Sequence, residues 1–161
     1  MPPTYRNPNQ EVADWARSVA AKPGSQGVPT ATRVFRSTGQ SLPSGLFTVM
    51  SWNSTAYSTT GMFDPTTPTR LYAPSTGIYT GTWNLGVAGG AWVEIYKNAN
   101  GVYGGGTLWH YNRSTNFTEG SVFENELVQG DYIEFFAGNT GGALTTGSDN
   151  VHCFMTLRLV A

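Results

Sequence analysis

The stretch Leu127-Val-Gln-Gly-Asp-Tyr-Ile-Glu-Phe135 decides the fold, because it combines a strand end, a tight turn and a strand start. Gly130 supplies the backbone freedom that a tight turn needs. The Asp131 carboxylate can accept hydrogen bonds from amides of the turn. After the turn, apolar and polar residues alternate with the period of a β-strand. The stretch therefore predicts two successive strands, with Asp131 as a turn former and not as a catalyst.

The same period of two runs from Ala31 onward, and turn residues recur about every eight to twelve positions, as in an all-β sandwich or barrel. Between two of the runs lies Asn98-Ala-Asn-Gly101. Asn-Gly is the strongest short signal for a β-hairpin, so its flanking strands should be antiparallel neighbours. The predicted strands are 31–37, 45–52, 69–73, 77–87, 91–98, 107–112, 121–128, 131–138 and 152–160.

Two further stretches complete the pattern: Tyr72-Ala-Pro-Ser-Thr-Gly-Ile-Tyr79 and Phe154-Met-Thr-Leu-Arg-Leu159. In their order and spacing, the three stretches resemble the globular-head domain of complement-type proteins, over about residues 31–161. The resemblance implies a ten-stranded, tumour necrosis factor-like jelly-roll sandwich that assembles as a homotrimer. Without that family's collagen-like stalk, the chain is similar to the stalkless jelly-roll trimers that bacterial viruses use as head decoration or tail-fibre heads.

The resemblance also implies which residues face the trimer axis. After the turn, Ile133 and Phe135 take the core, and strict alternation sends their neighbours to the opposite face. The last strand, with Met155 in the core, presents its alternate residues in the same way. Glu134 and Arg158 then become candidates for a charge pair within or between subunits, which is tolerable beside aromatic rings only if both partners are present. The residues expected at the trimer interface are Tyr132, Glu134, Phe136, Phe154 and Arg158.

Residues 1–30 follow a different pattern and form the expected N-terminal arm, separate from a head domain at 31–161. Asn7 can cap a helix, and Val12, Trp15 and Val19 then belong to one apolar stripe at helical spacing. An isolated helix of about 14 residues is marginal in water, so the stripe should dock on something. Packing on the chain's own domain is one alternative. The other is docking on a virus particle through Val12, Trp15 and Val19.

Composition limits the partners. Only 12% of the residues are charged, and nine Lys plus Arg against ten Asp plus Glu leave no broad basic face for a phosphate backbone. No apolar stretch approaches the roughly 20 residues of a membrane span, and the N-terminus lacks a signal pattern. We therefore expect a soluble, unprocessed chain that binds neither nucleic acid nor membrane. The single cysteine, Cys153, allows no internal disulfide.

The sequence offers little for catalysis or metal binding. His152 and Cys153 are adjacent on a predicted strand and so point to opposite faces, which disfavours a shared metal ion. No Gly-x-Ser-x-Gly nucleophile motif is present, and Gly104-Gly-Gly106 lacks the Lys-Ser/Thr ending of a phosphate loop. We expect no metal, no cofactor and no enzymatic activity.

Three hypotheses about function follow. The leading one is a structural virion protein of a bacteriophage: a trimeric capsid decoration protein, assembled in the host cytoplasm and attached to other virion proteins through its arm. The alternative is a tail or fibre receptor-binding module that recognises a host surface carbohydrate or protein through loops such as 53–68 and 99–106. An enzyme that degrades surface sugars through carboxylates such as Glu94 and Glu134 is the least favoured.

Overall fold

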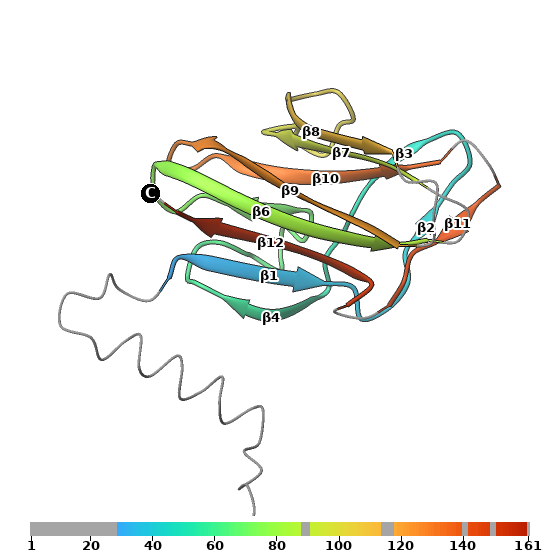
Figure 1. Ribbon diagram of the computed structural model, residues 1–161, viewed down its shortest axis with the longest axis horizontal. Helices are drawn as coiled ribbons and strands as arrows, with labels where there is room; N and C mark the ends of the chain where they lie inside the picture. Colours follow the sequence, from blue (N-terminus) through green and yellow to red (C-terminus); the bar gives the residue numbers. More distant parts are fainter. Residues whose placement is uncertain (1–28, 88–90, 114–117, 140–141, 149–150, 161) are drawn as a thin grey trace, which may run out of the picture.

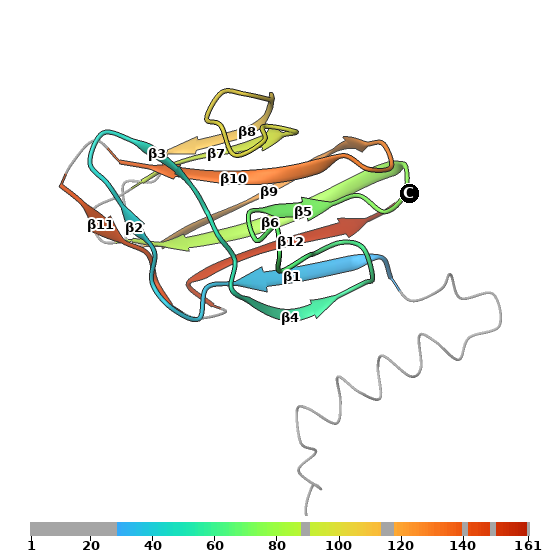
Figure 2. The ribbon, with the colours of Figure 1, turned by 180° about the vertical axis from the view of Figure 1, so that it is seen from behind.

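Two five-stranded sheets pack face to face in the computed structural model, which describes residues 29–87, 91–113, 118–139, 142–148 and 151–160 (Figure 1). The first sheet has the order β4-β1-β12-β6-β9. The second has the order β3-β10-β7-β8, and β5 also pairs with β10 (Figure 2). A two-stranded sheet, β11-β2, lies at one end of the sandwich. The strands are β1 (Ala31–Phe35), β2 (Ser41–Leu42), β3 (Phe47–Val49), β4 (Ser54–Ser58), β5 (Arg70–Tyr72), β6 (Gly77–Gly86), β7 (Trp92–Lys97), β8 (Thr107–Arg113), β9 (Thr118–Leu127), β10 (Tyr132–Gly138), β11 (Leu144–Thr145) and β12 (Cys153–Leu159).

All nine predicted strands are found, and the two large sheets supply the ten strands that the resemblance implies. Three short strands, β2, β4 and β11, were not predicted. β4 occupies part of 53–68, so the expectation of an apical loop there is wrong for 54–58. This strand is the edge of the first sheet and most of its residues are exposed, which leaves no apolar alternation to reveal it.

The turn between β9 and β10 forms as expected. Gly130 has a φ of 91°, in the region that favours glycine, and the Asp131 carboxylate accepts hydrogen bonds from the Val128 amide and the Asn98 side chain. The Lys97 ammonium lies 3.4 Å from the same carboxylate. Burial opposes ionisation of Asp131, but the hydrogen bonds from Asn98 and Val128, together with Lys97, lower its pKa below the ordinary value. Asp131 is thus confirmed as a turn former.

The hairpin predicted at Asn98–Gly101 is also confirmed, because β7 and β8 pair antiparallel and Asn98, Asn100 and Gly101 all have positive φ. Side chains do not alternate strictly along β8. A bulge separates the pairs of Ile95 and Tyr96, so that Trp109 is an extra residue in β8. Trp109 and His110 therefore both contact Phe123, instead of pointing to opposite faces.

Large aromatic side chains join the two sheets. Phe135 of β10 meets Trp83 of β6 edge to face with ring centroids 5.4 Å apart, and it meets Trp52 at 5.9 Å. Ile133 and Met155 are fully buried in the same core, as the family pattern implied. The sandwich core is thus filled from both sheets.

The expected arm helix, with its docking residues Val12, Trp15 and Val19, lies outside the described residues. Within the described residues, no helix has the length and apolar character that crossing a membrane requires.

The Phe123 ring of β9 covers Gly81 of β6, its cross-strand partner. A Cβ atom at Gly81 would collide with this ring. The Trp109 ring packs against the Phe123 ring with centroids 5.8 Å apart and so restricts its movement. We therefore expect Gly81→Ala to lower the free energy of unfolding by about 1 to 3 kcal/mol, as overpacking of a core does. Chemical denaturation at fixed protein concentration measures the change. Gly142→Ala is the matched control, because nothing lies within 4 Å of the added carbon; equal effects of the two variants would contradict the account.

Candidate functional site: an aromatic face with a buried acid

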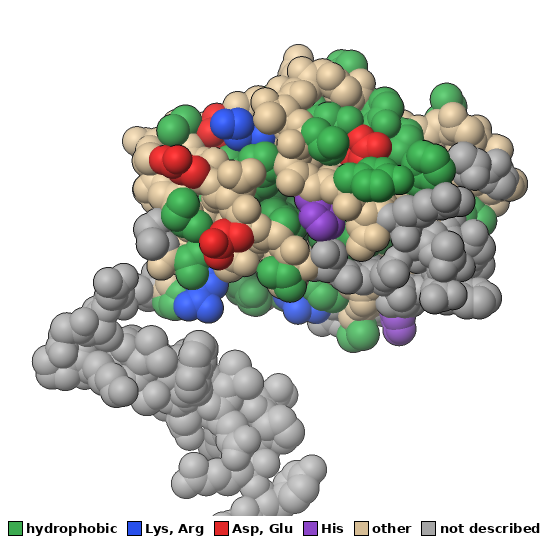
Figure 3. Space-filling view, turned by 45° about the horizontal axis from the view of Figure 1, so that its top comes forward, with side chains coloured by type: hydrophobic (Ala, Val, Ile, Leu, Met, Phe, Trp, Pro, Cys, Tyr) green, Lys and Arg blue, Asp and Glu red, His purple; other side chains and the backbone are tan. Residues whose placement is uncertain are grey.

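Aromatic side chains cover the outer face of the second sheet, where an antiparallel sheet is normally polar. Figure 3 shows hydrophobic side chains gathered over these strands, with an acidic group among them. We call this surface the aromatic face. Its members are Phe47, Trp92, Glu94, Tyr96, Tyr103, Tyr111 and Phe136.

The strand register brings these residues together. Trp92, Glu94 and Tyr96 alternate along β7 and so share one face. Glu94 pairs with Phe136 on one side and with Tyr111 on the other, which places a carboxylate between two rings. These cross-strand neighbours lie within contact distance in any antiparallel sheet.

Tyr103, from the loop between β7 and β8, folds back over the sheet. Its ring stacks on Phe47 with centroids 4.1 Å apart and an interplanar angle of 9°. It also meets Tyr96 and Phe136 edge to face, at 5.8 Å and 6.1 Å. Phe136 and Tyr96 are consequently buried, whereas Tyr103 itself is exposed.

The Glu94 carboxylate lies under this aromatic layer with 7% of the residue exposed. Tyr96 donates its hydroxyl to one carboxylate oxygen at 2.5 Å, and Tyr103 donates to the other at 3.0 Å. The pKa of both tyrosines is raised above the ordinary value. Burial is the largest cause, and the hydrogen bonds to Glu94 are the next. Among the described side chains, no Lys or Arg forms an ion pair with Glu94; the two pairs found are Arg70–Glu134 and Lys97–Asp131.

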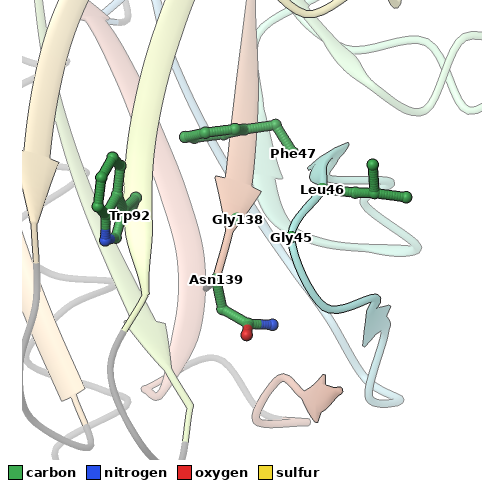
Figure 4. A pocket seen from close by; sticks show the side chains of 6 residues that line it. All are labelled: Gly45, Leu46, Phe47, Trp92, Gly138 and Asn139. Atoms are coloured by element: carbon green, nitrogen blue, oxygen red, sulfur yellow. The ribbon is translucent and has the colours of Figure 1, made fainter. Parts of the chain in front are cut away.

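A small hollow adjoins the aromatic face at the end of β10 (Figure 4). In the view of Figure 4, Trp92 and Leu46 lie on opposite sides of this hollow. Phe47 lies above Gly138, and Asn139 lies below Gly138. Asn139 is buried and donates to the Leu42 carbonyl at 3.2 Å. Its side-chain oxygen is buried and has no hydrogen-bond partner within the described part of the chain.

The residues predicted at the trimer interface fall into two groups on opposite sides of the sandwich. Tyr132, Glu134 and Phe136 belong to β10 in the second sheet, whereas Phe154 and Arg158 belong to β12 in the first. The expectation that they form one surface of the subunit is therefore wrong. Alternation along each strand was predicted correctly, but which sheet a strand joins is a long-range property that alternation does not contain.

Glu134 is fully buried and pairs with Arg70, so the expected pair with Arg158 within one chain is also wrong. The Arg70 guanidinium lies 4.3 Å from the centre of the Tyr132 ring, with its Nε 3.3 Å from Glu134. Glu134 also accepts hydrogen bonds from the Thr69 hydroxyl and the Gly101 amide. This carboxylate therefore ties the tip of the β7–β8 hairpin to β10.

The outer face of the first sheet is different in character. A cross-strand row runs over all five strands, with two threonines at its centre whose hydroxyl oxygens are 2.6 Å apart. Beside it, the Arg33 guanidinium covers the Phe154 ring at 3.8 Å, and Arg158 is exposed. We call this set the threonine row: Tyr57, Arg33, Thr156, Thr82 and Val122.

Metal-binding and histidine chemistry are limited in the described residues. No group of three or more His, Cys, Asp or Glu side chains among them lies close enough to hold a metal ion. His110 packs between Trp83 and Phe123, and its Nε2 is buried with no hydrogen-bond partner in the described part of the chain. Burial lowers the pKa of His110, which favours the neutral ring.

Sequence reasoning did not identify the aromatic face. The sequence indicates Glu94 only as one of several carboxylates, and the predicted trimer interface includes Phe136 alone from this set. The alternation Trp92-x-Glu94-x-Tyr96 was a usable signal, because it places an acid between two aromatic residues on one strand face. No pattern in the sequence predicts that Tyr103 folds back from its loop over the sheet.

Comparison with known proteins supports the fold and goes no further. No family model matches the chain, and no curated relative matches it. Solved structures do match. Murine APRIL at pH 8.0 is 12% identical with a TM-score of 0.62, and the match covers 82% of this chain and 99% of that one. Eiger TNF from S. frugiperda is 11% identical with a TM-score of 0.57, over 83% of this chain and 93% of that one, and the globular domain of zebrafish complement 1qA is 10% identical with a TM-score of 0.51, over 82% and 98%. The fold is therefore a jelly-roll β-sandwich like those of tumour necrosis factor and complement domains.

The raised pKa values of Tyr96 and Tyr103 predict loss of stability in alkali. The folded state holds these protons more tightly than the unfolded chain, so their contribution is complete below the ordinary tyrosine pKa of 10 and decreases as the pH rises above it. We expect Tyr96→Phe to weaken this decrease in the free energy of unfolding. Urea denaturation between pH 8 and 11 measures it, with Tyr57→Phe, an exposed tyrosine of β4, as control. An unchanged pH dependence in Tyr96→Phe would contradict the assignment.

Proposed function

We propose that the protein is a structural, non-enzymatic protein of a bacteriophage virion: a homotrimeric capsid decoration protein attached through its N-terminal arm. The observation that carries the proposal is the jelly-roll head at residues 31–159, preceded in the sequence by a segment with an apolar stripe. Fold alone assigns no function, so the attachment is the point to test.

For the trimer contact we propose the outer face of the first sheet. The predicted interface residues of β10 are already covered within their own chain: Glu134 by Arg70 and Phe136 by Tyr103. On the first sheet, Arg158 is exposed, and the threonine row ends in Val122, which is 67% exposed. This face combines an exposed valine and tyrosine at the ends of the row with charges of both signs, Arg158 and Glu124, and such a mixed surface suits association with a second copy.

Light scattering tests this contact. We expect the wild-type protein to have three times the chain mass of 17.3 kDa, and Val122→Arg to raise the dissociation constant at least about a hundredfold, since a charge buried without a partner costs about 3 kcal/mol or more. Val102→Arg is the matched control, because Val102 is a similarly exposed valine in the loop after β7. A wild-type monomer at micromolar concentration would refute the trimer, and a trimer insensitive to Val122→Arg would refute the chosen face.

Deletion of residues 1–28 tests the attachment. We expect the truncated protein to remain folded and to lose binding to phage particles, measured by co-sedimentation with particles that lack the protein. Trp15→Ala should weaken binding by about 2 kcal/mol or more, as truncation of a buried aromatic anchor does. Full binding by the truncated head would exclude the arm as the attachment.

A tail or fibre receptor-binding module is the second candidate, and the exposed rings of Tyr103 and Tyr111 on the aromatic face favour it. Such rings can stack on the sugars of a host surface. A decoration protein should bind the particle only, whereas a receptor-binding module should also bind host cells or an array of glycans. Whole-cell binding by the isolated protein therefore separates the two proposals.

A further inference from the structure

Glu94 is a buried carboxylate on an outer face with no cationic partner among the described side chains. Two tyrosine hydroxyls donate to it, one to each oxygen. A carboxylate offers about four acceptor positions, so about half of them remain. No Lys or Arg in the described part of the chain offsets its charge, and removing a carboxylate from water without a counter-charge is costly.

The same face contains a second buried carboxylate, and this one has a cationic partner. Glu134 is also buried between aromatic neighbours on the outer side of the second sheet, but there Arg70 supplies the counter-charge. The Arg70 guanidinium stacks on Tyr132 at 4.3 Å and lies 3.3 Å from the carboxylate through its Nε. Compared with this pair, the Glu94 site has the acid and the rings and lacks the guanidinium.

We propose that the aromatic face binds an arginine side chain of a partner protein, with the guanidinium paired to Glu94 and stacked on the exposed ring of Tyr111. Tyr111 is the cross-strand neighbour of Glu94, is 50% exposed and lies 6.4 Å from Trp92 between ring centroids. This inference does not depend on the virion role, since it specifies the chemistry of a contact and not the identity of the particle.

The site favours a guanidinium over other cations and over a sugar. A guanidinium is planar, stacks on rings and donates several hydrogen bonds in its plane, which suits a carboxylate beside an aromatic surface. A quaternary ammonium can lie against aromatic rings, but it has no N–H to donate to the carboxylate. A lysine provides a point charge without a stacking plane. A sugar would leave the charge of Glu94 uncompensated.

Titration of the full-length, ¹⁵N-labelled protein with N-acetyl-arginine methylamide tests the proposal. We expect saturable NMR shifts of the amides around Glu94 and of the Trp92 indole, with a dissociation constant in the millimolar range. Glu94→Gln should weaken binding about tenfold, the value of a hydrogen bond to a charged group. Glu124→Gln, an exposed carboxylate on β9 of the other sheet, is the matched control and should bind as the wild type does. Tyr111→Leu keeps the acid and should weaken binding several-fold, which gives a second test if Glu94→Gln fails to fold.

Three parallel titrations complete the test: tetramethylammonium, a set of methyl glycosides, and the arginine probe with an Arg113→Gln variant. Arg113 is the cross-strand partner of Trp92, so this variant asks whether the chain's own arginine is the occupant. The proposal is refuted by any of four results: no saturable shift at 50 mM arginine probe, equal binding by Glu94→Gln, tighter binding of tetramethylammonium or a glycoside, or binding of the probe only after Arg113→Gln.

Discussion

The edge-to-face contacts of Phe135 with Trp83 and Trp52 determine the orientation of the central strand of the second sheet. The three rings are almost completely buried, and each contributes about 1.5 to 3 kcal/mol by leaving water. Because side chains alternate along a strand, an inward Phe135 forces Glu134 and Phe136 outward. A slip of one residue would bury a carboxylate in the sandwich core and expose Phe135, so the register of β10 is strongly specified.

The outward position of Glu134 in turn holds the β7–β8 hairpin. Its carboxylate accepts the Gly101 amide and pairs with Arg70, whose guanidinium also donates to Asn100. Fixing this tip positions the loop that carries Tyr103 above Phe47 and Glu94. The aromatic face is therefore assembled with the help of an ion pair on its border, and the position of its loop member Tyr103 depends on residues distant in the sequence.

The sequence predicts what depends on neighbours along the chain. The alternation around Phe135, the turn at Gly130-Asp131 and the hairpin at Asn98–Gly101 are local features, and all are present as expected. The bulge at Trp109, the edge strand β4 and the assignment of β10 and β12 to different sheets depend on pairing across the fold, which periodicity does not encode. The aromatic face belongs to this second class, because Tyr103 reaches it from a loop.

Two buried carboxylates on one outer face would be an unusual cost if each served only the stability of the chain. Glu134 has a structural use, because its three described partners, Thr69, Arg70 and Gly101, connect β10 to β5 and to the tip of the hairpin. Within the described residues, Glu94 accepts hydrogen bonds only from the hydroxyls of Tyr96 and Tyr103, and phenylalanine at either position would keep most of the ring packing. An apolar residue at position 94 would continue the aromatic layer without any desolvation penalty. The acid at position 94 is therefore consistent with the proposed positively charged partner from outside the chain.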